Sequence, residues 1–342
     1  MKKSIKIIII LLIPVIIFGG SIGSFYIIGF MNYGVIQESY SFYYNPAIRA
    51  DPEKIRINTF GATINIKYNQ SSVPYYIKAD IDFKAEGMYM KGGSPAYYFT
   101  AYWNNNSLDS MPELFVTGMP PTLGPFYHPT WTVRYDIHIN ITLRTDILYD
   151  LHFDVWDTDI IISENLFINN LFIEAFSRNV GLNANGTNIN NIEATAYSGY
   201  LTMNLDSCNI SDGINATSTK GDINFLSYNI KCDKEVDWIL RTETGSINAI
   251  IFQDEVMGAN IFGDFFASMG HINIEYEDVL SAVGAIFNAM EFTGSFITTN
   301  LGGFDLVGSS LFRSIDYYSA NNSFTFTLRN HNGNIQVVGK SS

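Results

Sequence analysis

The sequence lacks several patterns on which enzymes and metalloproteins are built. Its five histidines show no His-Glu-x-x-His spacing, and neither a phosphate-binding glycine loop nor a dinucleotide-binding fingerprint occurs. Charged residues are also scarce, at 15% of the chain, and acidic residues outnumber basic ones, 33 to 20, for a net charge of −13. An acidic chain disfavours nucleic acid as a partner. We therefore expect no cofactor, no catalytic residues and no nucleic-acid binding.

A short pattern is instead repeated along the second half of the chain. Four glycines share it: Gly199, Gly221, Gly245 and Gly270. Apolar residues stand two positions after each glycine, at Leu201, Ile223, Ile247 and Ile272, and five positions before it, at Ala194, Ala216, Leu240 and Phe265. Alternation on both sides of a glycine predicts a strand, a tight corner and a second strand, with one face buried.

The same register extends to further corners, placed at residues 158, 178, 199, 221, 245, 270, 294, 313 and 333, which are 19 to 25 residues apart. One strand pair in each nearly constant period is typical of a β-solenoid, in which each coil buries its apolar row only against the next coil. The sequence thus predicts an all-β fold: a parallel β-solenoid of about nine coils. An antiparallel sandwich or meander with alternating strands is the competing interpretation.

The N-terminal segment predicts a membrane anchor. Residues 7–30 carry no charge, and Lys2, Lys3 and Lys6 precede them. This length suits one transmembrane helix, and the positive-inside rule places the N-terminus in the cytoplasm and the rest of the chain outside the cell membrane. A cleaved signal peptide is the alternative, because small residues follow the apolar core at 19–24. The absence of a cysteine after this run disfavours a lipid anchor.

Between the anchor and the repeats lies a region with a different pattern. Residues 55–68 contain one isolated copy of the motif with Ala62 at its corner, which we expect to cap the solenoid or pair with its first coil. Residues 70–130 follow no period and end in an apolar, proline-rich loop at 117–129. We expect three parts: an anchor at 1–36, a β cap with an aromatic, proline-rich insert at 37–150, and solenoid repeats at 151–342.

The two cysteines fall at matching positions of neighbouring copies. Cys208 and Cys232 each precede a corner glycine by 13 residues. Stacked neighbours in a parallel ladder are close enough for a disulfide, and an external compartment permits one. The sequence makes this pair a disulfide candidate, with two unpaired thiols as the alternative.

The repeats carry a family resemblance. The run from Tyr135 to Ser163 (YDIHINITLRTDILYDLHFDVWDTDIIIS) is followed by copies such as TKGDINFL from Thr219 and TGSINAII from Thr244. Residues 130–339 resemble the putative-adhesin β-solenoid family of uncharacterised, membrane-linked bacterial and archaeal proteins. The resemblance implies adhesion and carries over no catalytic residue. The insert at 70–130 departs from the pattern of that family.

Side chains on the outer face of the predicted coils supply the candidate ligand-binding residues. They are the aromatic row Trp156, Phe176 and Tyr197, the carboxylates Asp154 and Glu174, and Asp159 and Asn179 just after two corners. Rings at coil spacing beside carboxylates could stack on sugar rings and bind their hydroxyl groups, or the rings could simply pack against each other under the N-terminal region. Glu275, Glu277 and Asp278 form a weaker, calcium-like candidate without a calcium-loop consensus.

These observations lead to one functional hypothesis and one alternative. The hypothesis is a single-pass, extracytoplasmic β-solenoid protein that serves adhesion or as an envelope scaffold and binds a glycan or a surface protein. The alternative is a solenoid carbohydrate-active enzyme that uses Asp154 and Glu174, since stacked carboxylates approach the separation found in retaining glycosidases.

Overall fold

The computed structural model describes residues 31, 33–47, 49–69, 72–87, 96, 98–104, 111–118, 133–279 and 283–341. In these ranges the chain is all-β. The strands are, in chain order, β1 (Gly34–Tyr44), β2 (Glu53–Phe60), β3 (Thr63–Asn69), β4 (Ile77–Gly87), β5 (Thr100–Asn104), β6 (Glu113–Thr117), β7 (Val133–Arg144), β8 (Tyr149–Trp156), β9 (Thr158–Ile162), β10 (Phe167–Ala175), β11 (Val180–Asn185), β12 (Asn188–Ala196), β13 (Leu201–Asp206), β14 (Asn209–Lys220), β15 (Ile223–Tyr228), β16 (Val236–Thr244), β17 (Ile247–Gln253), β18 (Ile261–Met269), β19 (Ile272–Asp278), β20 (Val283–Phe292), β21 (Phe296–Gly302), β22 (Phe304–Val307), β23 (Leu311–Ser314), β24 (Asn322–Asn332) and β25 (Ile335–Lys340).

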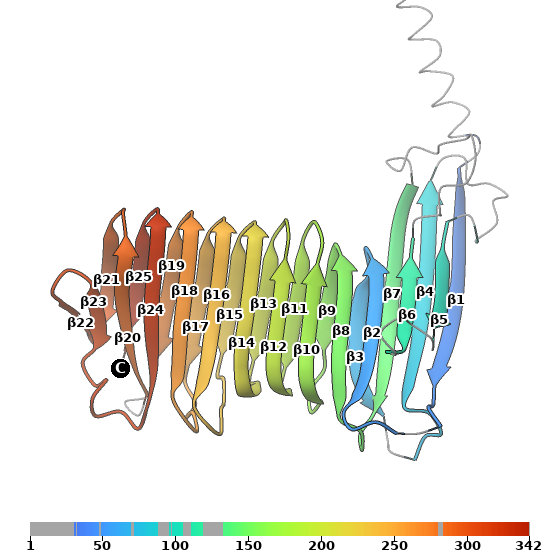
Figure 1. Cartoon of the computed structure of the whole chain (residues 1–342), viewed down its shortest axis with the longest axis horizontal. Coiled ribbons are helices and arrows are strands. Elements are labelled where there is room, and N and C mark those ends of the chain that lie inside the picture. The colour runs from blue at the N-terminus through green and yellow to red at the C-terminus, as the bar shows by residue number, and fades with distance from the viewer. Residues whose placement is uncertain are drawn as a thin grey trace, which may run out of the picture. The chain divides into compact units, whose positions relative to one another are not determined.

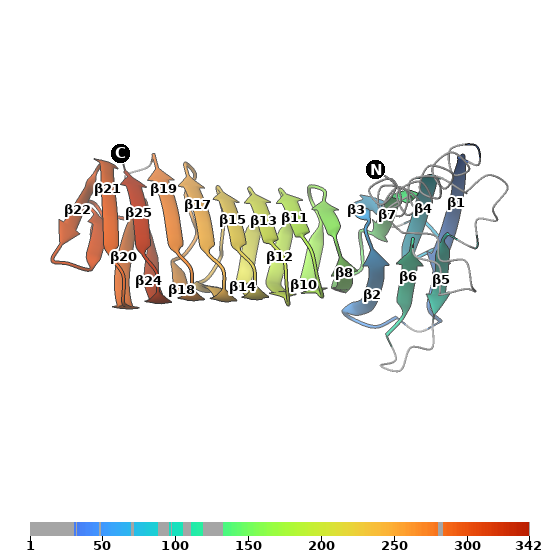
Figure 2. The ribbon, with the colours of Figure 1, turned by 90° about the horizontal axis from the view of Figure 1, so that it is seen from above.

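The strands form two long sheets (Figures 1 and 2). The 12-stranded sheet has the order β1-β4-β7-β3-β9-β11-β13-β15-β17-β19-β25-β21, and the 13-stranded sheet has the order β22-β23-β20-β24-β18-β16-β14-β12-β10-β8-β2-β6-β5. The chain divides into two compact units, of which the first comprises residues 1–39, 82–100 and 118–137 and the second comprises residues 40–81, 101–117 and 138–342.

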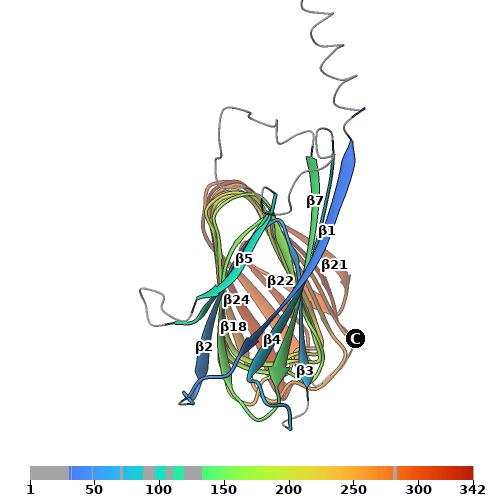
Figure 3. The same ribbon diagram turned by 90° about the vertical axis from the view of Figure 1, so that its right-hand side faces the viewer.

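In the second unit, each repeat places one strand in each sheet on either side of its corner. Strands of successive repeats are parallel neighbours: Ile192 of β12 pairs with Leu171 of β10 on one side and Ile214 of β14 on the other. These three side chains are fully or almost fully buried. Burial of each such side chain stabilises the fold by about 2 kcal/mol. Figure 3 shows the two sheets on opposite sides of this interior. The parallel pairing expected from the register is confirmed.

Glycines at successive corners allow the backbones of neighbouring repeats to approach closely. Gly221 has a φ of +141°, and a Cβ atom there would lie 1.8 Å from the carbonyl oxygen of Gly199 in the preceding repeat. A Cβ at Gly245 or Gly270 would likewise lie 2.2 or 2.0 Å from the carbonyl oxygen of the corner glycine before it. Only a residue without Cβ permits this close approach of successive backbones.

The isolated motif near the N-terminus joins the stack as expected. Ile57 of β2 pairs with Phe153 of β8, and Ile64 of β3 pairs with Ile160 of β9. All four side chains are buried. The strands at residues 53–69 therefore form one more repeat on the N-terminal side of β8 and β9.

At the other end of the stack, the order of the repeats differs from the order in the chain. β24 pairs with β18 on one side and β20 on the other, so the repeat with its corner at Gly333 lies between the repeats of Gly270 and Gly294 (Figure 1). The corner predicted at Arg313 is wrong: β22 and β23 form an antiparallel hairpin that pairs with β20. Weak apolar alternation around Arg313 fits a hairpin as well as a corner.

The first unit contains an aromatic core of its own. The rings of Phe83 and Phe99 stack with centroids 4.4 Å apart, and the ring of Tyr135 lies 6.3 Å from that of Phe83. Phe83, Ala85 and Phe99 are buried. The proline-rich loop lies, for residues 119–132, outside the described residues. The expected boundaries at residues 36 and 150 stay predictions.

The anchor predicted over residues 7–30 also lies outside the described residues. Within the described ranges, no helix has the length and apolar character needed to span a membrane.

The cysteine pair does not form a disulfide, because Cys208 and Cys232 are both free. Asn209 pairs with Lys231, and Gly213 pairs with Asp237. Gly213 is four residues after Asn209, whereas Asp237 is six residues after Lys231. These two extra residues shift the register, so that Cys232 lies level with Ile210 instead of with Cys208. Counting back from the corner glycines could not detect this insertion.

Both thiols are expected to react slowly with alkylating reagents while the protein is folded. Burial raises the pKa of the Cys208 thiol to about 11 and raises the pKa of the Cys232 thiol as well, so both stay protonated at pH 8. Mass spectrometry after iodoacetamide treatment at that pH should find both unmodified, and both modified in denaturant. Rapid modification of the folded protein would contradict this placement.

Candidate functional site

The outer face of the 13-stranded sheet brings most of the predicted ligand-binding residues together. Alternate residues of β8, β10 and β12 point away from the interior. Asp154 pairs with Glu174, so the two carboxylates predicted to stack do lie on neighbouring strands.

The predicted aromatic row forms a continuous ladder. The ring centroids of Trp156 and Phe176 are 4.9 Å apart, and those of Phe176 and Tyr197 are 5.8 Å apart. Phe60 extends the ladder, with its centroid 6.0 Å from that of Trp156. Sequence reasoning missed Phe60, although it stands two residues before the Ala62 corner, as the other rings do relative to theirs.

The ladder becomes more exposed toward Tyr197. Phe176 is 37% exposed and Tyr197 is 47% exposed, so the described residues leave these rings accessible to a ligand. The ladder stops there because the next repeat carries Thr219 at this level. The face of the Tyr197 ring that is turned away from Phe176 therefore has no ring stacked on it.

A second aromatic pair runs parallel to the ladder. The rings of His152 and Phe172 stack with centroids 4.3 Å apart and an interplanar angle of 23°. Arg56 of β2 is level with His152. These three residues were not predicted, because they stand six residues before their corners and the prediction rests on the rows nearest the corners.

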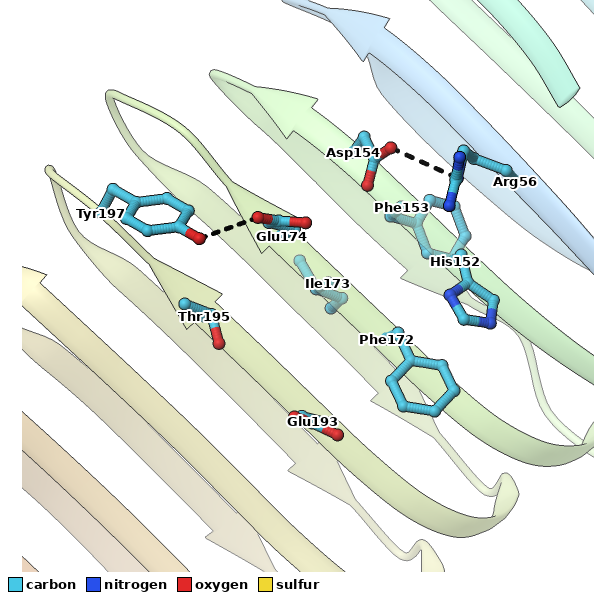
Figure 4. Close-up of a pocket in the computed structure, with 10 residues that line it drawn as sticks. All are labelled: Arg56, His152, Phe153, Asp154, Phe172, Ile173, Glu174, Glu193, Thr195 and Tyr197. Carbon is cyan, nitrogen blue, oxygen red and sulfur yellow. Dashed lines mark hydrogen bonds and ion pairs between the residues drawn. The ribbon is translucent and has the colours of Figure 1, made fainter. Parts of the chain in front are cut away.

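Between the two aromatic rows lies a depression of about 310 Å³, which we call the trough (Figure 4). Its lining residues are Arg56, His152, Phe153, Asp154, Phe172, Ile173, Glu174, Glu193, Thr195 and Tyr197. The trough thus combines aromatic edges with carboxylates and a hydroxyl group between them.

Two interactions organise the polar groups of the trough. The Tyr197 hydroxyl donates a hydrogen bond of 2.9 Å to Glu174, and Arg56 Nε lies 3.5 Å from Asp154 Oδ2. The hydrogen bond to Glu174 raises the pKa of Tyr197, which keeps that phenol protonated as a donor. Burial lowers the pKa of His152, so its imidazole is neutral at pH 7.

The lining is therefore acidic. Asp154, Glu174 and Glu193 carry three negative charges, and Arg56 carries one positive charge. Arg56 is paired with Asp154, at the opposite end of the trough from Glu193 (Figure 4). The negative charge in excess lies on Glu174, the strand neighbour of Asp154, and on Glu193 of β12, on the side of the trough away from Arg56 (Figure 4).

Asp159 and Asn179 do not belong to the trough, contrary to the prediction. The left-handed corner residue of the first repeat is Asp157, with a φ of 52°, and not Thr158. Asp159 consequently pairs with Gly181 on the 12-stranded sheet, while Asn179 lies in a corner and accepts a hydrogen bond from the Tyr200 backbone. The two side chains occupy different levels and leave the ring-bearing face.

The acidic cluster proposed near residue 277 is divided between two faces of its strand. Glu275 is exposed and Glu277 forms an ion pair with Lys340, whereas Asp278 is buried and accepts a hydrogen bond of 2.8 Å from Ser341. No group of three or more histidine, cysteine, aspartate or glutamate side chains within the described ranges could hold a metal ion. The calcium-like candidate is therefore not supported.

Comparisons with known proteins give only remote likenesses. The sequence matches no protein-family profile and no curated protein. Among solved structures, a putative adhesin from Bacteroides fragilis is 11% identical, with a TM-score of 0.37 over 89% of this chain and 97% of its own.

Two more solved structures have similar names. A putative adhesin from Parabacteroides distasonis is 11% identical, with a TM-score of 0.33 over 72% of this chain and 91% of its own. A putative cell adhesion protein from Clostridium sporogenes is 12% identical, with a TM-score of 0.26 over 90% of this chain and 100% of its own. These names match the family that the repeats resemble, but TM-scores below 0.5 do not establish a shared function.

Proposed function

We propose that the chain is a membrane-anchored, extracytoplasmic β-solenoid protein that binds polysaccharide at the trough and serves adhesion or envelope organisation without catalysis. The parallel stacking of the repeats supports the solenoid interpretation. The uncharged run at 7–30 behind three lysines supports an anchor with its N-terminus in the cytoplasm.

The observation that carries the binding proposal is the exposed end of the ring ladder beside hydrogen-bonding groups. A sugar ring has apolar C–H faces and hydroxyl groups around its rim, so it suits an aromatic surface next to carboxylates. Tyr197 is 47% exposed and has no ring stacked on its face away from Phe176, and Glu174 and Thr195 lie beside it in the trough. Ligand sites commonly combine aromatic surface with a few convergent polar groups in this way.

Binding fits the trough better than hydrolysis does. A glycosidase would use Asp154 and Glu174 as its two carboxyl groups, one of them protonated. Asp154 is instead paired with Arg56, whose Nε lies 3.5 Å from its Oδ2, and Glu174 accepts a hydrogen bond of 2.9 Å from the Tyr197 hydroxyl. These contacts engage both carboxyl groups with protein partners and do not single out one of them as a proton donor to a leaving group.

Replacing the exposed ring at the end of the ladder should weaken polysaccharide binding. We expect Tyr197→Ala to lower the affinity of the full chain in detergent micelles by up to about tenfold, because it removes an aromatic contact worth about 0.5–1.5 kcal/mol. Trp156→Ala should weaken binding by a similar factor, since it removes support for the neighbouring ring. A glycan array followed by titration with the best ligand measures both effects.

Tyr200→Ala is the matched control, because Tyr200 is equally exposed, at 49%, but does not line the trough. It should leave affinity unchanged. An equal loss in this variant, or no glycan bound by the unaltered chain, would contradict the proposal.

A further inference from the structure

The charges at the two ends of the trough differ in a way that selects its ligand. At one end, the Arg56 guanidinium is paired with Asp154. At the other end, no cationic side chain of the described residues is paired with Glu174 or Glu193. Glu174 has the neutral Tyr197 hydroxyl as its hydrogen-bond partner. Two carboxylates without a counter-charge thus remain on β10 and β12 at this end.

Aromatic rings flank these carboxylates. Phe172 is level with Glu193, and Tyr197, at the end of the ladder, donates a hydrogen bond to Glu174 (Figure 4). The electron-rich face of an aromatic ring attracts a cation, and an ammonium group between rings and carboxylates gains from both interactions. An anionic or purely neutral ligand would gain from neither.

The long-range field acts in the same direction. The whole chain carries a net charge of −13, so it attracts cationic polymers and repels acidic ones before contact. Acidic polysaccharides, such as those with uronate or sulfate groups, would face repulsion at both stages of binding.

We propose that the Glu174–Glu193 end of the trough binds a polysaccharide whose sugar units carry free amino groups. This inference rests on the proposed polysaccharide binding and adds the chemical class of the ligand. The ring of such a sugar contacts the uncovered face of Tyr197, while its ammonium group lies between the two carboxylates. The Thr195 hydroxyl, on the next strand at the level of Glu174, shares a hydrogen bond of 3.1 Å with the Thr217 hydroxyl and has further lone-pair capacity to accept one from a ring hydroxyl.

A lysine-rich peptide would also supply ammonium groups, but it fits less well. Each lysine side chain loses about 1.5–2 kcal/mol of rotamer entropy when it is fixed, whereas an amino group on a sugar ring is held in place by the ring itself. The uncovered ring face of Tyr197 also matches the flat face of a sugar better than a flexible methylene chain.

The test compares three oligosaccharides of equal length by isothermal titration with the full chain in detergent micelles. They are an oligomer of glucosamine with free amines, its N-acetylated counterpart and a glucose oligomer. We expect the amine form to bind at least tenfold more tightly than the other two, and to lose most of this advantage when salt is raised from about 50 to 500 mM. A lysine oligopeptide is titrated in parallel and should bind more weakly than the amine oligomer.

Glu193→Gln removes one charge without changing the size of the side chain. It should weaken binding of the amine oligomer about threefold to tenfold and leave the glucose oligomer unaffected. Glu243→Gln is the matched control, because Glu243 is an exposed carboxylate on the same sheet outside the trough. It should alter neither affinity.

The outcomes separate this inference from the proposed function. Equal affinity for the amine and N-acetylated oligomers, both reduced by Tyr197→Ala, would overturn the amine specificity and leave polysaccharide binding in place. Tighter binding of the lysine peptide than of any sugar would overturn the amino-sugar assignment. Binding of none of the oligosaccharides, in the array or in solution, would overturn both proposals.

Discussion

Gly221→Ala is expected to lower the free energy of unfolding by about 3 kcal/mol or more. The new Cβ would lie 1.8 Å from the carbonyl oxygen of Gly199, at a φ of +141° that side-chain-bearing residues rarely adopt. Relief of this contact requires the backbones of these two repeats to separate, which stretches the 2.8 Å hydrogen bond from the Gly199 amide to the carbonyl of Lys220. Thermal unfolding followed by circular dichroism should show a midpoint lower by roughly 6–12 °C.

Gly61→Ala provides the control for this effect. Gly61 also lies at a corner, with a φ of +65°, but a Cβ there would meet no atom within 4 Å. Its cost is limited to the left-handed backbone conformation, about 1 kcal/mol. Equal destabilisation by the two substitutions would show that backbone conformation, and not the close approach of stacked corners, limits the repeats.

Phe326→Ala should destabilise the protein by about 3–5 kcal/mol, the cost typical of a large cavity in a packed core. Phe326 is fully buried, and its ring lies 5.2 Å from that of Phe265 in β18 and 5.1 Å from that of Phe287 in β20. Gly263, its partner on β18, leaves the space that the ring fills, since a Cβ there would lie 2.1 Å from Phe326 Cδ1. Chemical denaturation measures the loss.

Phe262→Ala is the matched substitution on the neighbouring strand β18. Phe262 is 39% exposed, so its removal leaves no internal cavity and should cost less than about 1 kcal/mol. A small loss for Phe326→Ala would indicate that β24 does not lie between β18 and β20 and would favour stacking in chain order.

The sequence was sufficient to predict the stacked part of the fold where each corner carries the same residues. Leu201, Ile223 and Ile247 lie level with each other, as their spacing from Gly199, Gly221 and Gly245 requires. The predicted register is wrong where a repeat contains extra residues away from its corner, as between Lys231 and Asp237. A count of residues from a glycine cannot show on which side of the strand an insertion lies.

The order of the last repeats could not be predicted from periodicity. The motif around Gly333 has the same apolar pattern as its neighbours, so it could be placed next to Gly270 or at the end of the stack. Packing decides between them: Gly263 offers a space that the ring of Phe326 fills. That fit depends on two residues far apart in the chain.

The candidate site was predicted only where its residues belong to consecutive repeats in the chain. Trp156, Phe176 and Asp154 follow from the shared register, and the structure places them on one face. Arg56 and Phe60 come from a repeat separated by the irregular region at 70–130. Their contribution became apparent only from the pairing of β2 with β8.

The position of the final repeat has a consequence for protein synthesis. A ribosome releases β20 and β21 before β24 and β25, the strands that lie between them and the earlier layers. The nascent protein must therefore keep an unfinished edge at β18 and β19 until residues 322–340 have been translated. A premature stop codon in this region would delete an interior layer and leave β20, with its hairpin, without the strand that joins it to β18.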